Sequence, residues 1–247
     1  MTPEKFTLYE LTQFRKLKAW EKKMRHPASF IDKISGRIQR KFNSIIPEKI
    51  HQAITVVVKK MVQAVLFTSE FVRPATSMNE NLQEIERSVE KRLEYYRSTA
   101  AVEGGVTGFS GIAGSFADFP LLLAIKIKFL FDVASLYGFD TSDLKERIYL
   151  LYVFQLAFSN PLHRGATFEK INNWEAVAAE MPADLKSLDW RDFQQQYRDY
   201  LDLAKMAQMI PGIGAVVGVV VNYRLLNQLS STAMMCYRKR WLDRKAA

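Results

Sequence analysis

Residues 104–120 read GGVTGFSGIAGSFADFP, a run of small residues that opens an otherwise apolar stretch. Wound as an α-helix, this segment places Gly104, Gly108, Gly111 and Asp118 near one line of the helix surface, with bulky apolar side chains on the other side. A glycine inside a helix costs about 1 kcal/mol relative to alanine, so such a helix is stable only where another element approaches its bare backbone. The pattern therefore predicts a helix over residues 104–117 that packs closely on a second helix.

A second glycine-led segment supplies the expected partner, a helix over residues 213–240. Gly114 precedes Tyr137 by 23 residues, and Gly214 precedes Tyr237 by the same interval. Both windows run from small residues through an apolar core to a tyrosine near the helix end, which suggests two similar helices that pack on each other. The crossing is expected to bring three glycines of the first helix against two of the second: Gly104, Gly108 and Gly111 against Gly214 and Gly218.

Apolar residues recur at helical spacing along almost the whole chain, and the fold class is predicted to be all-α, a multi-helix globular domain with two closely packed glycine-rich helices. Thr7 with Glu10 forms a capping box, Asp118 and Pro120 suit the start of a helix, and Gly138 suits its end. Residues 162–188 are expected to be a loop with one short helix near residues 173–180. The other expected helices are 7–26, 30–45, 47–71, one that starts from a second capping box at 77–80, 118–137, 140–160, 189–210 and 214–241.

The net charge of +9 is concentrated at the N-terminal end. Residues 1–60 hold 14 Lys/Arg against five Asp/Glu, whereas residues 61–247 hold 21 of each. We therefore divide the chain into a basic amphipathic helical region, residues 1–75, and a glycine-rich helical core, residues 76–247, within one continuous domain. The basic surface is either a solvated helical face or a contact for anionic lipid headgroups. Four residues of the expected helix 30–45 are the candidate membrane-facing cations: Lys33, Arg37, Arg40 and Lys41.

Several common kinds of site are disfavoured. Cys236 is the single cysteine and the three histidines are scattered, so we expect no metal. The glycines of residues 212–218 resemble a dinucleotide fingerprint but follow a helical segment, and no phosphate-binding loop is present, so no cofactor is expected. Nucleic acid is not expected as a partner because the chain has no matching motif and no dense Arg/Lys run. The N-terminus lacks a signal-peptide pattern, which favours the cytoplasm.

Polar residues inside the apolar stretches mark one candidate cleft between the two glycine-led helices. Its members are Asp118, Lys126, Asp132, Asn222, Arg224 and Asn227. The simpler alternative for Lys128 and Asp132, which are four residues apart on one helix, is a surface ion pair. Neither of the apolar stretches in the two glycine-led helices contains about 20 consecutive residues without a charged side chain. Ordinary membrane-spanning helices are therefore not expected.

The sequence resembles the EcsC family over nearly the whole chain. The resemblance rests on the glycines of residues 104–114, DFP at 118–120, YGFD at 137–140, ER at 146–147, IPGIGA at 210–215, VNYR at 221–224 and AMMCYR at 233–238. It implies a bacterial origin and a membrane-proximal role, since the family takes its name from a protein encoded beside an ABC transporter. It implies no catalytic residues.

Two classes of function follow. The first is a non-catalytic accessory or interaction protein that contacts an anionic membrane surface or a membrane-associated protein. The alternative is a soluble hydrolase or small-molecule-binding module whose cleft lies near Asp118, Asn222 and Arg224. Neither the residues nor the resemblance predicts an oligomeric state.

Overall fold

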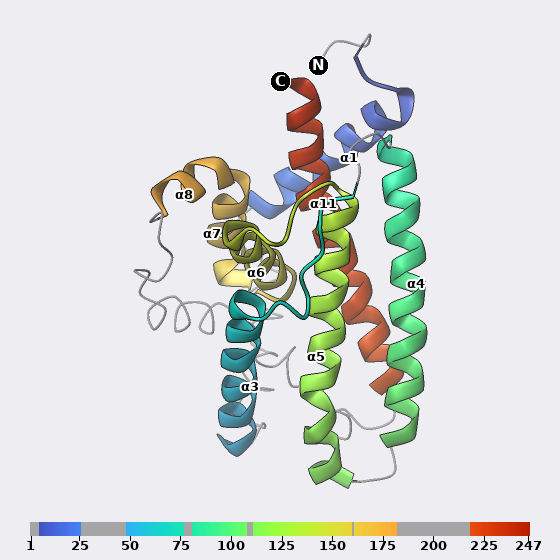
Figure 1. Ribbon diagram of the computed structural model, residues 1–247, viewed down its shortest axis with the longest axis vertical. Coiled ribbons are helices and arrows are strands. Elements are labelled where there is room, and N and C mark those ends of the chain that lie inside the picture. Colours follow the sequence, from blue (N-terminus) through green and yellow to red (C-terminus); the bar gives the residue numbers. More distant parts are fainter. Residues whose placement is uncertain (1–4, 26–47, 77–80, 108–110, 160, 182–217) are drawn as a thin grey trace.

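The computed structural model describes residues 5–25, 48–76, 81–107, 111–159, 161–181 and 218–247, and this part of the chain contains eight helices and no β-strand (Figure 1). The all-α prediction is therefore confirmed. The expected helices 30–45 and 189–210 lie outside the described residues. The described helices are α1 (Leu8–Arg25), α3 (Glu48–Phe67), α4 (Leu82–Thr107), α5 (Gly111–Leu136), α6 (Leu144–Phe158), α7 (Pro161–Asn172), α8 (Trp174–Glu180) and α11 (Gly218–Ala246).

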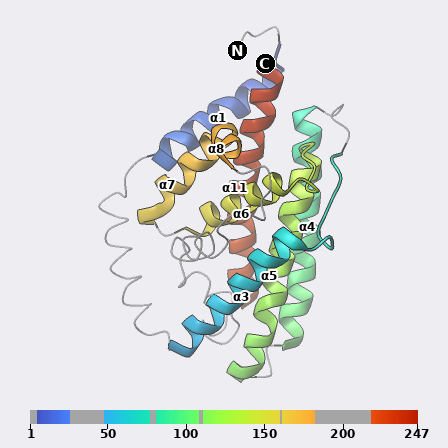
Figure 2. The same ribbon diagram turned by 60° about the vertical axis from the view of Figure 1, so that its left-hand side comes forward.

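Three long helices, α4, α5 and α11, lie side by side and form the main body of the molecule (Figure 1). The short helix α6 contacts both α5 and α11, and its residues from Glu146 to Phe158 are all buried. Since α6 is buried on all sides, its polar residues Glu146, Arg147 and Gln155 require partners in the interior. Around this centre, α3 packs on α5 and α6, whereas α1 packs on α11, α7 and α4 (Figure 2).

The helix ends follow from local side-chain chemistry. The capping box is confirmed at α1, where the Glu10 carboxylate accepts from the Thr7 backbone N–H at 2.7 Å and Thr7 Oγ1 accepts from the Glu10 N–H at 3.2 Å. Asp143 caps α6 by accepting from the Lys145 N–H at 2.9 Å. Gly138 ends α5 with φ 78°, and the N–H of Phe139 donates to the Ala134 carbonyl oxygen at 3.0 Å, as in a Schellman motif.

The first turn of α4 has a side-chain cap. Asn81 Oδ1 accepts from the Glu84 backbone N–H at 3.0 Å, so Asn81 caps the first turn. The capping box predicted at residues 77–80 lies outside the described residues.

The glycine stretch is arranged differently from our prediction. Residues 104–107 end α4, and residues 111–117 begin α5, so the expected separate helix over residues 104–117 is wrong. The expected helix start at Asp118 is also wrong, because α5 continues through Pro120. Low helix propensity places the junction between the two helices inside the glycine stretch. Beyond it, burial of Phe119, Leu122 and Leu123 offsets the hydrogen bond that Pro120 cannot donate. The predicted glycine contacts with Gly214 lie outside the described residues.

Residues 161–181 are more helical than predicted. In place of a loop, α7 spans Pro161–Asn172 and is followed at once by α8, the short helix that was expected. Pro161 occupies the first helical position, where no N–H is required. Thr167, Phe168 and Ile171 are buried at helical spacing, and this tertiary burial stabilises a segment whose proline and glycine content suggested irregular structure.

Candidate functional site

The most unusual polar contact joins Lys126 on α5 to Asn222 on α11. The Lys126 side chain is fully buried, and its Nζ donates to Asn222 Oδ1 at 3.0 Å and to the Leu122 carbonyl oxygen at 3.3 Å. Both acceptors are neutral, and burial lowers the pKa of Lys126 to about 7. This contact brings together two of the residues predicted to form a polar cleft, but the pair lies in the protein interior.

Asp132 belongs to a second group of contacts. Tyr96 donates from its hydroxyl to Asp132 Oδ2 at 2.9 Å, and the Nε atoms of Arg73 and Arg92 lie 3.3 Å and 3.6 Å from the same carboxylate. Burial, and then the negative charge of Asp132, raises the pKa of Tyr96. Asp132 is thereby tied to α4 and to the segment after α3, while the two arginines extend to the surface.

The predicted surface pair between Lys128 and Asp132 is wrong. Lys128 Nζ instead lies 3.4 Å from a Glu70 carboxylate oxygen and 5.7 Å from the centre of the Phe71 ring. Spacing of four residues makes a pair possible, but the elements that pack on α5 decide each partner. Here the segment after α3 supplies a carboxylate to Lys128, and Asp132 has its own cations.

The remaining members of the predicted cleft are placed separately. Asn227 accepts a hydrogen bond from Arg97 Nε at 2.9 Å, and the Arg97 guanidinium stacks over the Tyr223 ring at 4.3 Å. Arg224 is exposed, and the side chain of Asp118 lies outside what the structure describes. Among the described members, Lys126 and Asn222 are the pair that the fold brings into contact.

Two buried carboxylates that were not singled out from the sequence organise the interior. Glu86 accepts from Arg238 Nε at 2.6 Å, from the Tyr9 hydroxyl at 2.6 Å and from the Tyr137 hydroxyl at 3.2 Å. The burial of Glu86 could have been predicted from the sequence, because Glu86 lies four residues after Leu82 and therefore on the apolar face of α4.

Glu146 forms the second buried network, at the start of α6. It accepts from the Tyr237 hydroxyl at 2.7 Å and from Arg240 NH1 at 2.8 Å. Burial raises the pKa of Glu146, and the positive charge of Arg240 opposes that shift. The Arg240 guanidinium also stacks on Phe139 at 3.9 Å and on Tyr149 at 4.4 Å. Both networks join helices through buried groups.

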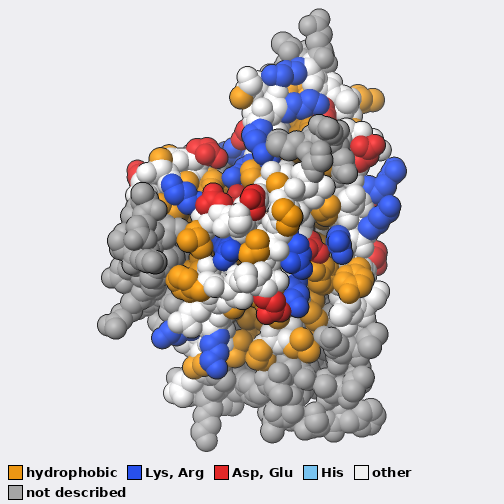
Figure 3. All heavy atoms as spheres, in the orientation of Figure 1, with side chains coloured by type: hydrophobic (Ala, Val, Ile, Leu, Met, Phe, Trp, Pro, Cys, Tyr) orange, Lys and Arg blue, Asp and Glu red, His pale blue; other side chains and the backbone are white. Residues whose placement is uncertain are grey.

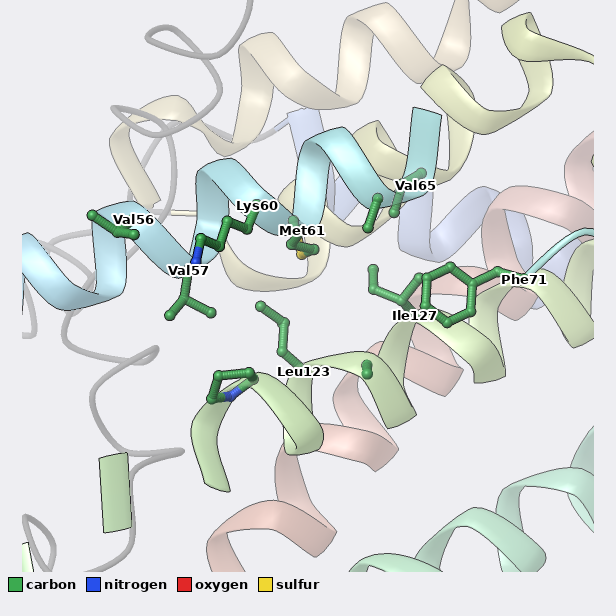
Figure 4. Close-up of a pocket in the computed structure, with 11 residues that line it drawn as sticks. Val56, Val57, Lys60, Met61, Val65, Phe71, Leu123 and Ile127 are labelled. Carbon is green, nitrogen blue, oxygen red and sulfur yellow. The ribbon is translucent and has the colours of Figure 1, made fainter. Parts of the chain in front are cut away.

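The surface offers a different kind of site, an apolar groove between α3 and α5 with a volume of about 310 Å³ (Figure 4). Val57 on α3 points toward α5, Lys60 extends along α3 beside Val57, and Phe71 closes one end (Figure 4). Lys60 is the one charged residue among the described residues that line the groove. Concave apolar sites with few polar groups are typical places for ligands.

Exposed apolar side chains lie on the same two helices. Val56 and Phe67 on α3 are 52% and 62% exposed, and Leu121 on α5 is 46% exposed. Figure 3 shows hydrophobic side chains intermixed with Lys and Arg side chains over the face that carries α3 and α5. We call the exposed residues Val56, Phe67 and Leu121, together with the groove, the α3–α5 face.

A second hollow, of about 540 Å³, lies between the α7–α8 junction and the end of α11. Its cations have partners within the protein. Lys239 pairs with Asp243 at 2.6 Å, Arg240 pairs with Glu146, and Arg244 NH2 donates to the Tyr137 carbonyl oxygen at 3.0 Å. The contacts of Arg240 and Arg244 hold the C-terminal half of α11 against α6 and the end of α5, whereas the Lys239–Asp243 pair lies within α11.

Metal-binding clusters and membrane-spanning helices are both absent from the described part of the chain. No three His, Cys, Asp or Glu side chains of these residues are grouped as metal ligands. None of the described helices is both long enough and apolar enough to cross a bilayer. The four predicted membrane-facing residues, Lys33, Arg37, Arg40 and Lys41, lie outside the described residues.

Comparison with known proteins gives consistent results over nearly the whole chain. A model of the EcsC protein family matches residues 11–242. The chain is 45% identical over 228 residues to "Protein EcsC" of Bacillus subtilis (strain 168), covering 92% of this chain and 94% of that protein. It is 26% identical over 235 residues to "Uncharacterized protein YdbA" of the same organism, covering 90% of this chain and 85% of the relative. No solved structure matches significantly.

Proposed function

Because the chain belongs to the EcsC protein family, we propose that it is a non-catalytic accessory or interaction protein that associates peripherally with anionic membrane surfaces. The observation that carries this proposal is the composition of α3. This helix exposes large apolar side chains, Val56 and Phe67, together with Lys59 and Lys60. An amphipathic helix with lysines beside exposed apolar residues is typical of segments that lie in the membrane interface.

The distribution of charge supports the same role. The helix α3 follows the basic residues of the N-terminal region, which carries the entire excess of +9. Near an anionic membrane each Lys or Arg contributes about 1 kcal/mol, and the attraction falls off within a Debye length. Once the protein reaches the membrane surface, burial of its exposed apolar side chains contributes about 25 cal/mol per Å² of apolar area removed from water. Together they favour binding that is reversible and sensitive to salt.

Co-flotation with liposomes tests the proposal. We expect the protein to float with vesicles that contain phosphatidylglycerol and to stay behind with vesicles of pure phosphatidylcholine, and we expect salt to weaken the binding. Neutralising Lys33, Arg37, Arg40 and Lys41 together should weaken it further. Failure to float with anionic vesicles even at low ionic strength would overturn the proposal.

Matched variants separate specific contacts from general charge. The double variant Arg40→Gln/Lys41→Gln should weaken flotation more than Arg87→Gln/Lys91→Gln, which removes the same charges from the exposed side of α4. Likewise Phe67→Ser should weaken flotation, whereas Tyr95→Ser, an exposed aromatic on α4, should not. Equal effects within each pair would show that neither the basic residues before α3 nor the exposed Phe67 of α3 has a special role.

A further inference from the structure

We infer that the groove between α3 and α5 binds one acyl chain of an anionic membrane lipid, with Lys60 holding the headgroup. This inference rests on the proposed function and adds a defined lipid site to it. Its first support is the shape of the site. The groove has a volume of about 310 Å³, within the range of small-ligand sites, and it lies between two helices rather than across a flat surface.

The chemistry of the walls selects the ligand. Met61 and Val65 from α3 oppose Leu123 and Ile127 from α5, and no lining side chain among the described residues other than Lys60 can form a hydrogen bond (Figure 4). A polar metabolite would lose its hydration here without gaining partners. A hydrocarbon chain has no hydrogen bonds to water to give up, and it covers the apolar walls of the groove, which would otherwise face water. The flexible Met61 side chain can adapt to a chain of variable shape.

Lys60 favours a lipid whose headgroup is negatively charged. The groove carries one lining cation and no lining carboxylate among the described residues, and Lys60 has no ion pair with another described residue. Its stem lines the apolar wall while its ammonium can reach solvent, as long lysine side chains do at membrane interfaces. An anionic phosphate at the mouth of the groove complements this charge.

The surroundings of the groove point to a membrane as the source of the chain. Val56 is a lining residue that is also half exposed, and the exposed Leu121 follows the lining residue Pro120 on α5. The apolar interior is therefore continuous with the apolar residues that we place against the bilayer surface. A lipid could transfer its chain from the bilayer to the groove without crossing water.

The test uses cis-parinaric acid, a fluorescent fatty acid, at a concentration where it is monomeric. We expect the full-length protein to enhance its fluorescence, and lysophosphatidylglycerol to displace it better than lysophosphatidylcholine does. Ala124→Trp, which fills the groove, should abolish the enhancement, whereas Ala166→Trp, at an exposed position of α7, should not. Circular dichroism melting curves establish that both variants are folded.

A charge-reversal pair tests the role of Lys60. Lys60→Glu should weaken parinarate binding at least about fivefold, because it replaces an attraction by a repulsion. Lys59→Glu makes the same charge change at the neighbouring exposed position, which does not line the groove, and should change it less than about twofold. Equal effects of the two variants would overturn the assignment of Lys60.

The outcomes distinguish this inference from the proposed function. If the wild-type protein floats with anionic vesicles but shows no parinarate binding that Ala124→Trp removes, the groove is not a lipid site and peripheral association stands. If a second copy or another segment of this chain occupies the groove, parinarate will not bind, which also overturns the inference. If parinarate binds in the groove but the protein does not float with anionic vesicles, the lipid site is supported and the proposed membrane association is contradicted.

Discussion

The rings of Tyr137 and Tyr237 stack with their centroids 5.9 Å apart and an interplanar angle of 26°, although the residues are separated by one hundred positions in the chain. The two hydroxyls diverge to different buried carboxylates, Tyr137 to Glu86 at 3.2 Å and Tyr237 to Glu146 at 2.7 Å. The stacked pair thus connects both ionic networks at the point where the end of α5 meets α11. The interval that repeats before each tyrosine suggested that these two helices pack on each other, and α5 and α11 are in contact, whereas the predicted close crossing through Gly214 lies outside the described residues.

Replacing Glu86 by glutamine should destabilise the protein strongly. Glu86→Gln leaves the Arg238 guanidinium buried without its counter-charge, and breaking one side of a buried ion pair costs about 3–5 kcal/mol. The free energy of unfolding in urea measures the effect. Glu90→Gln, at an exposed position on the same helix, should change it by less than about 0.5 kcal/mol. Similar unfolding midpoints for the two variants would contradict a structural role for Glu86.

Lys126 should make stability depend on pH. Its pKa is about 7 in the folded protein against 10.5 for the free side chain, so between these values the unfolded chain binds more protons than the folded chain. The free energy of unfolding then rises with pH, by up to about 1.4 kcal/mol per pH unit from this group. Below pH 7 both states are protonated and the cost of burying the charge is fully present.

The variant Lys126→Met isolates this contribution. The free energy of unfolding of this variant should exceed that of wild type by most at pH 7 and below. The difference should shrink as the pH rises toward 10.5. Urea unfolding across this range measures the difference. Lys59→Met, at an exposed position, should show no such trend. A constant difference between Lys126→Met and wild type would mean that Lys126 does not titrate in this range.

Two glycine-to-alanine substitutions should have opposite signs. Gly138 has φ 78°, so Gly138→Ala forces a left-handed conformation on an L side chain and should cost about 1–2 kcal/mol. Gly165 lies inside α7 and an added Cβ would meet nothing within 4 Å, so Gly165→Ala should stabilise by up to about 1 kcal/mol. Thermal melting compares them. A loss of stability in Gly165→Ala would show that the surface of α7 is closer to another element than the described residues indicate.

Cys236 should be inert in the folded protein. It is fully buried, and burial raises the pKa of its thiol, so little thiolate is available at neutral pH. Labelling with Ellman's reagent should be slow in buffer and rapid in denaturant. As a positive control, Ser142→Cys adds an exposed thiol before α6, which should react at once in the native state. Rapid native labelling of wild type would place Cys236 in a segment that opens readily.

Features set by neighbouring residues could be predicted from the sequence. The capping box of Thr7 and Glu10 and the stop at Gly138 each depend on contacts within a few positions, and both are confirmed. The all-α class follows from hydrophobic periodicity in the same way. Family membership was likewise readable, because its motifs are short and spread over the chain.

Features set by contacts between distant segments could not be predicted. Helical spacing placed Lys128 and Asp132 close together, yet Glu70 and Arg73, from the segment after α3, determine their partners. The groove also depends on how α3 lies against α5, which no local pattern specifies. Local conformation is determined by backbone geometry and by hydrogen bonds between near neighbours. The partner of a buried charge and the shape of a cavity depend on which helix faces pack together, and that is decided by the minimisation of exposed apolar area over the whole chain.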